Sequence, residues 1–152
     1  MKSLILIPAL LLLAHFGFAQ AKNIKINNTT GCKIYLSLRL SEPTIDPCAP
    51  KYEGAEFAVP PYSVLTFDYT NYPGSTASAA QYFLYAKIFE APSGSGCTGL
   101  GDAVGVGETC YGFPQSAMLT AHESNCTVCD DVKAIWHPQP NPNGYAVLEI
   151  IP

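Results

Sequence analysis

The most reactive side chains of this sequence lie close together near its carboxyl end. Cys126 and Cys129 form a Cys-x-x-Cys motif, and His122 and His137 stand on either side of it. Such a motif can be a redox centre when it opens a helix of a thioredoxin-like unit, because the helix dipole stabilises the thiolate. Cysteine and histidine are also preferred zinc ligands. This cluster therefore indicates one possible function, a small redox or zinc-dependent enzyme.

The surroundings of the motif favour a structural disulfide instead. The sequence around it shows no alternating strand and helix, and Asp130 and Asp131 follow it directly, where their charges would oppose a thiolate. The spacing of the two histidines matches no standard zinc finger. We therefore expect no catalytic residue, no metal site and no cofactor, and we favour a protein that is not an enzyme.

Aromatic side chains are the second candidate for function. The chain has 9 tyrosines and 1 tryptophan, which is more than a small core needs. Aromatic faces on a β-sandwich can stack on sugar rings or anchor a protein partner. We expect Tyr111, Trp136 and Tyr145 to be binding residues. The alternative is that these side chains are ordinary strand residues, half buried and half exposed.

The amino-terminal segment predicts export. A basic start is followed by an apolar run from Leu4 to Phe18 and then by small residues, an order typical of a secretory signal peptide. Cleavage is expected after Ala19, with the bond after Ala21 as the alternative. The apolar run is short for a membrane span and has no charged flank on its far side, so no membrane insertion is expected after cleavage.

The remaining composition describes the exported part. Residues 1–19 would be the signal peptide, and residues 20–152 are enough for one domain with a single core. Charged residues make up 13% of the chain, and its formal net charge is −4. A small negative net charge provides no positive electrostatic potential that would attract phosphate groups, so nucleic acid is not an expected partner. We expect the protein to be secreted, periplasmic or on the cell surface.

Six cysteines in an exported chain predict disulfides. Sequence alone cannot choose among the possible pairings. Proximity along the chain suggests Cys32–Cys48, Cys97–Cys110 and Cys126–Cys129.

Alternation of apolar and polar residues predicts the strands. It is clearest over 33–40, recurs over 63–69, and in 81–90 apolar residues occupy both faces, which favours a central strand. Residues 24–26 and 33–40 predict a hairpin, and 132–136 and 145–151 predict a final strand pair. Residues 42–52 and 92–107 are rich in proline or glycine and are expected to be loops. About eight short strands predict an all-β fold, a single disulfide-stapled antiparallel β-sandwich.

Two stretches carry a resemblance to a known group of proteins. The run from Ile24 to Leu36 and the run from Val59 to Phe67 resemble the opening of small exported β-sandwich proteins of Bacteroidota-type bacteria, which have no assigned activity. The resemblance implies the same fold and the same destination. It implies no functional residue.

These observations favour an exported, non-enzymatic binding or structural module. Its partner would be a glycan or a cell-envelope protein, recognised through loops and aromatic residues. The alternative function is the redox or zinc-dependent enzyme that would use the Cys126/Cys129 and His122/His137 cluster.

Overall fold

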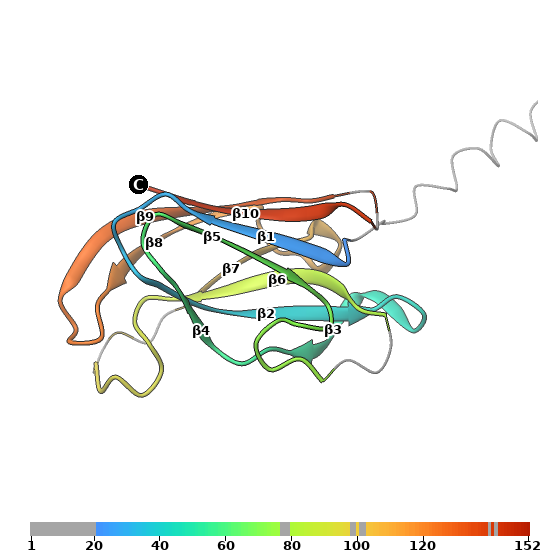
Figure 1. The fold of residues 1–152 in the computed structure, drawn as a ribbon, viewed down its shortest axis with the longest axis horizontal. Helices are drawn as coiled ribbons and strands as arrows, with labels where there is room; N and C mark the ends of the chain where they lie inside the picture. Colours follow the sequence, from blue (N-terminus) through green and yellow to red (C-terminus); the bar gives the residue numbers. More distant parts are fainter. Residues whose placement is uncertain (1–20, 77–79, 98–99, 101–102, 140, 142) are drawn as a thin grey trace, which may run out of the picture.

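The structure is a computed structural model that describes residues 21–76, 80–97, 100, 103–139, 141 and 143–152. Within these residues the regular elements are ten β-strands and a short 3-10 helix, η2 (Thr109–Tyr111). Figure 1 shows the strands arranged in two layers.

The first sheet has five strands in the order β5-β1-β10-β9-β8. All neighbours in it are antiparallel except β1 and β10, which run parallel. The sheet is therefore mixed, and the prediction of a purely antiparallel fold was wrong at this pair. The strands are β5 (Ser63–Asp68), β1 (Asn23–Asn28), β10 (Tyr145–Ile151), β9 (Val128–His137) and β8 (Ser116–His122).

The second sheet has the order β3-β2-β6-β7, and the short strand β4 pairs with β2 beside this path. All its pairs are antiparallel. Strand β6 lies between β2 and β7, as its two apolar faces predicted. The strands are β2 (Ile34–Glu42), β3 (Asp46–Glu53), β4 (Phe57–Val59), β6 (Tyr82–Phe89) and β7 (Ala103–Gly107).

The core lies between the two layers. Every second residue of the central strands is buried, because side chains of a strand point alternately to its two faces. These buried residues expose 1% of their surface or less, and they come from both sheets: Ile24, Ile26, Leu36, Leu38, Ala86, Ile88, Ala134, Trp136, Leu148 and Ile150. The predicted all-β class is confirmed, and the strands form two sheets in a chain with three disulfides.

Strands β1 and β2 do not form the hairpin that the sequence predicted, because they belong to different sheets. The buried side chain of Asn28 holds the crossing between them. Its Nδ2 donates to the carbonyl oxygens of Cys32 at 2.8 Å and Pro60 at 2.9 Å, and its Oδ1 accepts from the backbone N–H of Thr30 at 3.1 Å. These bonds satisfy buried polar groups where the chain leaves one layer for the other.

Two segments predicted as loops contain strands. Residues 42–52 carry three prolines, yet most of them lie in β3, which pairs with β2 through an irregular register. Proline is tolerated there because β3 is an edge strand, so its outer N–H groups need no partner in the sheet. Residues 103–107, at the end of the second predicted loop, form the edge strand β7.

The disulfides are Cys32–Cys129, Cys48–Cys110 and Cys97–Cys126. None of the three pairings suggested by proximity along the chain is present. The fold brings together cysteines that are 97, 62 and 29 residues apart, because strands pair with partners that are distant in sequence.

Three disulfides fit an oxidising, extracellular type of environment. Among the residues that the structure describes, no helix has the length and apolar character needed to cross a membrane. The expected signal peptide, residues 1–19, lies outside the described residues.

Candidate functional site

The three predicted binding aromatics do not form one surface. Trp136 exposes only 1% of its surface and lies in the core, where its Nε1 donates to Glu108 Oε1 at 3.1 Å. It is a core residue, so its prediction as a binding residue was wrong. Tyr111 and Tyr145 are exposed, but Tyr145 belongs to β10 of the first sheet, whereas Tyr111 belongs to η2 beside the second.

Tyr111 is one member of an aromatic cluster, which also contains Tyr85 and Phe113 and which we call the aromatic platform. The ring centroids of Tyr85 and Phe113 are 4.1 Å apart, and those of Tyr111 and Phe113 are 5.3 Å apart. The rings of Tyr85 and Tyr111 are nearly parallel, at 6°, with centroids 6.1 Å apart. Tyr111 is 43% exposed, so the platform presents an aromatic surface to solvent.

The platform lies on the outer face of the second sheet. Tyr85 alternates along β6 with the buried residues Leu84 and Ala86, and its partner across the sheet is Gly107 of β7. At Gly105 of the same strand, an added Cβ would lie 2.5 Å from the ring of Phe113. Glycine in β7 therefore gives the aromatic rings room to lie against the sheet.

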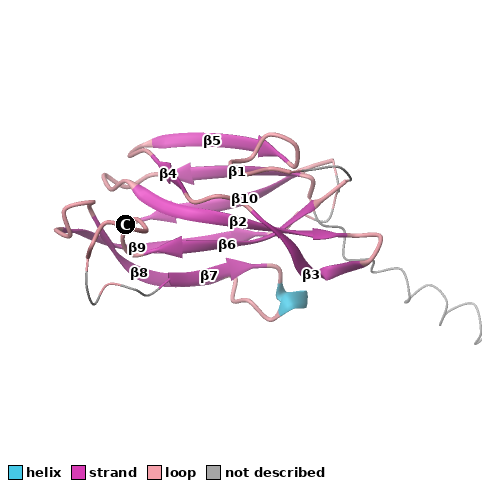
Figure 2. Cartoon of the chain, turned by 90° about the horizontal axis from the view of Figure 1, so that it is seen from below, coloured by secondary structure: helices cyan, strands magenta, loops and turns pink. Residues whose placement is uncertain are grey.

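The loop that carries Tyr111 and Phe113 is fixed at several points. The disulfide of Cys110 with Cys48 ties it to β3. Gly112 has a left-handed backbone with φ of 85°, and its N–H donates to the carbonyl oxygen of Thr109. Gly112 thereby caps the carboxyl end of η2. Figure 2 shows η2 (cyan) after the end of β7 and close to β3. A loop fixed in this way can present aromatic rings with little entropy lost on binding.

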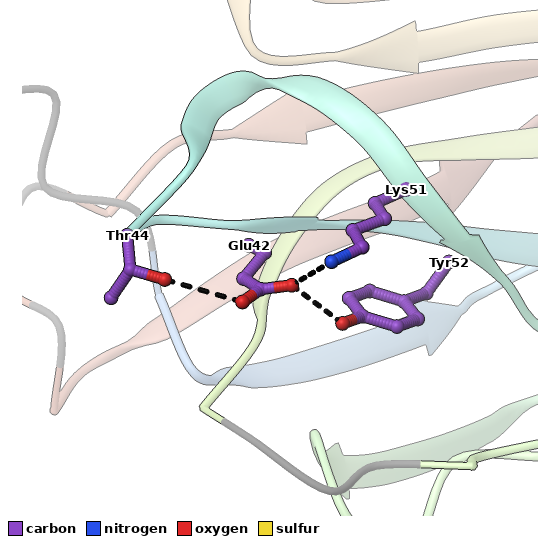
Figure 3. Close-up of polar contacts among 4 residues, drawn as sticks. All are labelled: Glu42, Thr44, Lys51 and Tyr52. Carbon is purple, nitrogen blue, oxygen red and sulfur yellow. Dashed lines mark hydrogen bonds and ion pairs between the residues drawn. The ribbon is translucent and has the colours of Figure 1, made fainter.

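Cys48, the partner of Cys110, lies in β3, which forms a hairpin with β2. Glu42 on β2 accepts hydrogen bonds from the hydroxyl groups of Tyr52 at 2.7 Å and Thr44 at 3.2 Å, and it forms an ion pair with Lys51 (Figure 3). The hydrogen bonds from Lys51 and Tyr52 lower the pKa of Glu42. These contacts join the two strands beside Cys48. They also border a pocket of about 210 Å³ lined with the exposed Ile45 and the neighbouring hairpin residues.

Charged groups lie next to the platform. Arg39 of β2 is opposite Tyr85 of β6 in the sheet and forms an ion pair with Glu53 of β3. Their side chains are 25% and 51% exposed. Burial raises the pKa of Tyr85, and the nearby Arg39 charge opposes that shift. On the side of β2 and β3, the platform is thus bordered by a guanidinium, which donates hydrogen bonds, and a carboxylate, which accepts them.

Glu108 connects the platform to the core. It directly precedes η2, its backbone N–H donates to the carbonyl oxygen of Leu84 at 2.9 Å, and its side chain accepts from Trp136. Burial raises the pKa of this carboxyl, and the hydrogen bond from Trp136 opposes the shift only in part. Its charge is therefore destabilising in the folded state.

The pH dependence of stability tests this account of Glu108. A carboxyl with a raised folded pKa contributes stability that is complete below its unfolded value, 4.5, and is lost as pH rises through the folded pKa. Glu108→Gln should remove that loss, since the amide oxygen still accepts from Trp136. Urea unfolding at several pH values should therefore show the variant gaining stability over the parent as pH rises above 4.5.

Glu42→Gln is the matched control, because the pKa of Glu42 is shifted in the opposite direction. This variant should lose stability relative to the parent above pH 4.5, the ordinary value for Glu42. Equal pH dependence in Glu108→Gln and the parent would contradict the buried-charge account.

The residues of the alternative redox or zinc cluster each have other partners in the structure. Cys126 is bonded to Cys97 and Cys129 to Cys32, so the two cysteines of the motif do not form a disulfide with each other. His122 is buried, with its Nδ1 3.0 Å from the carbonyl oxygen of Thr120. His137 instead lies on β9, with its Nε2 3.0 Å from Glu149 Oε2 on β10. In the described part of the chain, no group of three or more histidine, cysteine, aspartate or glutamate side chains is placed to hold a metal ion.

Comparison of the chain with protein-family models, with curated proteins and with solved structures finds no match in any of the three. The function must therefore be inferred from the site itself.

Sequence reasoning missed Tyr85, Phe113 and Glu108. The alternation in β6 placed Tyr85 on one face of the strand but did not show what covers that face. Phe113 is separated from Tyr111 by Gly112 alone and is followed by proline, a pattern that fits a tight aromatic turn. That pattern was the only local signal of the platform.

Proposed function

We propose that this chain is an exported, non-enzymatic binding module that recognises a glycan through the aromatic platform of Tyr85, Tyr111 and Phe113. The observation that carries the proposal is the exposed ring of Tyr111, packed against two further rings on a loop fixed by the Cys48–Cys110 disulfide. The C–H groups of a sugar ring pack well on an aromatic face.

The size of the platform favours a glycan over a protein partner. A stable protein interface buries roughly 800 Å² on each partner, which is far more than a few rings provide. The other exposed large apolar side chains are spread over different elements, for example Ile45 before β3, Met118 on β8 and Tyr145 on β10. Among the described residues, these exposed apolar side chains therefore do not belong to the elements that carry the platform.

The neighbouring polar groups also suit a sugar. Hydroxyl groups both donate and accept hydrogen bonds, and beside the platform Arg39 offers donors while Glu53 offers acceptors. Oriented polar groups around an aromatic surface are the usual source of specificity in small-molecule sites. The glycan would stack on Tyr111 and extend toward the ion pair of Arg39 and Glu53.

Binding of the exported protein to a glycan array tests the proposal. The parent should bind at least one glycan, and Tyr111→Ala should weaken that binding by about tenfold or more, as expected for an aromatic anchor. Because Tyr111 is outside the core, the variant should keep the far-UV circular dichroism spectrum of the parent.

Tyr62→Ala is the matched control. Tyr62 is also an exposed tyrosine outside the strands, at 77%, but it lies between β4 and β5 and not on η2. This variant should bind as the parent does. A parent protein that binds no glycan, or a Tyr62→Ala variant that loses binding as Tyr111→Ala does, would contradict the proposal.

A further inference from the structure

The face of the second sheet that carries the aromatic platform continues along β6. Side chains two residues apart on a strand point to the same face, so Lys87 follows Tyr85 there, at a distance of about 7 Å along the strand. The residue between them, Ala86, is fully buried in the core. Across the sheet, Lys87 is opposite Gly105, where the ring of Phe113 lies against β7. Lys87 therefore adjoins two of the three rings of the platform.

The charge of Lys87 has no carboxylate partner among the residues that the structure describes. Lys87 is half-buried, and its Nζ lies 5.0 Å from the centroid of the Phe89 ring, a cation–π contact. Such a contact at a partly exposed site stabilises an ammonium group less than a charge-assisted hydrogen bond does. The ammonium group thus keeps its donors available to an anionic group of a ligand.

Two acidic residues at or beside β3 and β4 have other partners. Glu53 forms the ion pair with Arg39. Glu56, which precedes β4, accepts a hydrogen bond of 2.9 Å from the backbone N–H of Ser93. Neither carboxylate offsets the charge of Lys87.

Two further polar atoms of this face lack hydrogen-bond partners among the described residues. Ser37 of β2 is opposite Lys87 and only 2% exposed, and its Oγ is unpaired. The Nε of Arg39, which is opposite Tyr85, is likewise buried and unpaired. Buried polar atoms without partners are rare in folded proteins. Two of them on one strand, next to Lys87 and the platform, favour a polar ligand for this face over an apolar one.

We propose that the glycan is acidic and that the ammonium group of Lys87 binds its anionic group, a carboxylate or a sulfate. The inference deepens the proposed function and rests on it, because the sugar that stacks on Tyr85 and Tyr111 brings the acidic group to Lys87. Charge-assisted hydrogen bonds are about twice as strong as those between neutral groups. Lys87 thereby distinguishes an acidic sugar from a neutral one of the same shape.

The overall charge of the chain makes this recognition local. The formal net charge is −4, so the protein does not attract polyanions in general. A preference for acidic glycans must therefore depend on a cation placed beside the stacked sugar, which is the position of Lys87.

Affinity measurements with matched acidic and neutral oligosaccharides test this inference. The carboxylate probes are oligosaccharides of galacturonate, alginate and hyaluronate, each beside its methyl ester. The sulfate probes are sulfated galactose oligosaccharides beside their desulfated forms. The parent should bind the acidic member of at least one pair about tenfold or more tightly than its neutral counterpart, as expected for a hydrogen bond to a charged group. The pair that shows the preference tells a carboxylate from a sulfate.

Lys87→Gln tests the assigned residue, because it removes the charge and keeps a hydrogen-bond donor. This variant should bind the acidic and neutral members of the preferred pair equally, with its affinity for the neutral member unchanged from the parent. Lys25→Gln is the matched control. It removes the same charge from the exposed Lys25 of β1, in the first sheet, and should keep the full preference of the parent.

The outcomes separate this inference from the proposed function. A parent that binds neutral glycans, but prefers no acidic member of any pair, would overturn the inference and leave glycan binding intact. A preference that persists in Lys87→Gln, or disappears in Lys25→Gln as well, would also overturn the role of Lys87. A parent that binds no glycan of either kind would contradict the proposed function itself. The comparison within the parent requires no variant, so it holds even if Lys87→Gln does not fold.

Discussion

Trp136→Ala is expected to lower the free energy of unfolding by about 3–5 kcal/mol, the range for a large aromatic residue removed from a core. Trp136 is among the largest fully buried side chains of the described residues, and its loss would also leave the partly buried carboxyl of Glu108 without its donor. Far-UV circular dichroism in urea measures the change, because the parent has only this one tryptophan and the variant has none for fluorescence.

Trp136→Phe separates packing from the hydrogen bond. It keeps much of the ring volume and loses only the donor to Glu108, so its cost should be clearly smaller than that of the alanine variant. If Trp136→Ala instead abolished glycan binding without loss of stability, Trp136 would be a binding residue after all.

Removal of the Cys32–Cys129 disulfide is the second change with a large expected effect. Taken as the only crosslink, the bond closes a loop with a sequence separation of 97, for which loop-closure entropy gives about 4.7 kcal/mol; the Cys48–Cys110 bond inside that loop shortens it in the unfolded chain and lowers this figure. The Cys97–Cys126 bond has a separation of 29, which gives about 3.6 kcal/mol. Each pair is replaced by two alanines, and urea unfolding compares the variants with the parent.

The order of the two effects is the test. Cys32 is also buried in the core, so its replacement adds a packing loss to the entropy loss. The Cys32/Cys129 variant should therefore be the less stable of the two. A Cys97/Cys126 variant that is equally or more destabilised would contradict the larger contribution expected from the Cys32–Cys129 bond and the buried Cys32.

Local patterns in the sequence predicted the strands well, because burial of one strand face leaves a period of two in the chain. Lys33 to Leu40, Ser63 to Tyr69 and Tyr145 to Ile151 each correspond closely to a strand of the structure.

Pairing over long distances could not be predicted in the same way. The parallel pair of β1 and β10 joins the two ends of the domain, and no local pattern encodes it. Cysteine pairing follows from strand order, so the suggestion of Cys126–Cys129 failed for the same reason. Strand β3 was predicted as a loop because it contains Pro47 and Pro50. Proline is excluded from central strands but is compatible with an edge strand, and the sequence alone did not show that this segment lies at an edge.

The aromatic platform illustrates the same limit for function. Tyr85 and Tyr111 belong to β6 and η2, and they meet because β7 has glycine at 105 and 107 and because Cys110 is bonded to Cys48. Trp136, by contrast, was chosen for its residue type alone. Residue type did not distinguish a buried aromatic ring from an exposed one, because tryptophan is common in both settings.

The most direct test of the central claim is NMR chemical-shift mapping of the parent protein with the glycan that binds it most tightly on the array. The account predicts that the largest shifts on addition of glycan fall on Tyr85, Tyr111, Phe113 and the adjacent Arg39, with small changes on the first sheet. Shifts concentrated around Tyr145 on β10, or around the pocket beside Ile45, would contradict the aromatic platform as the binding site.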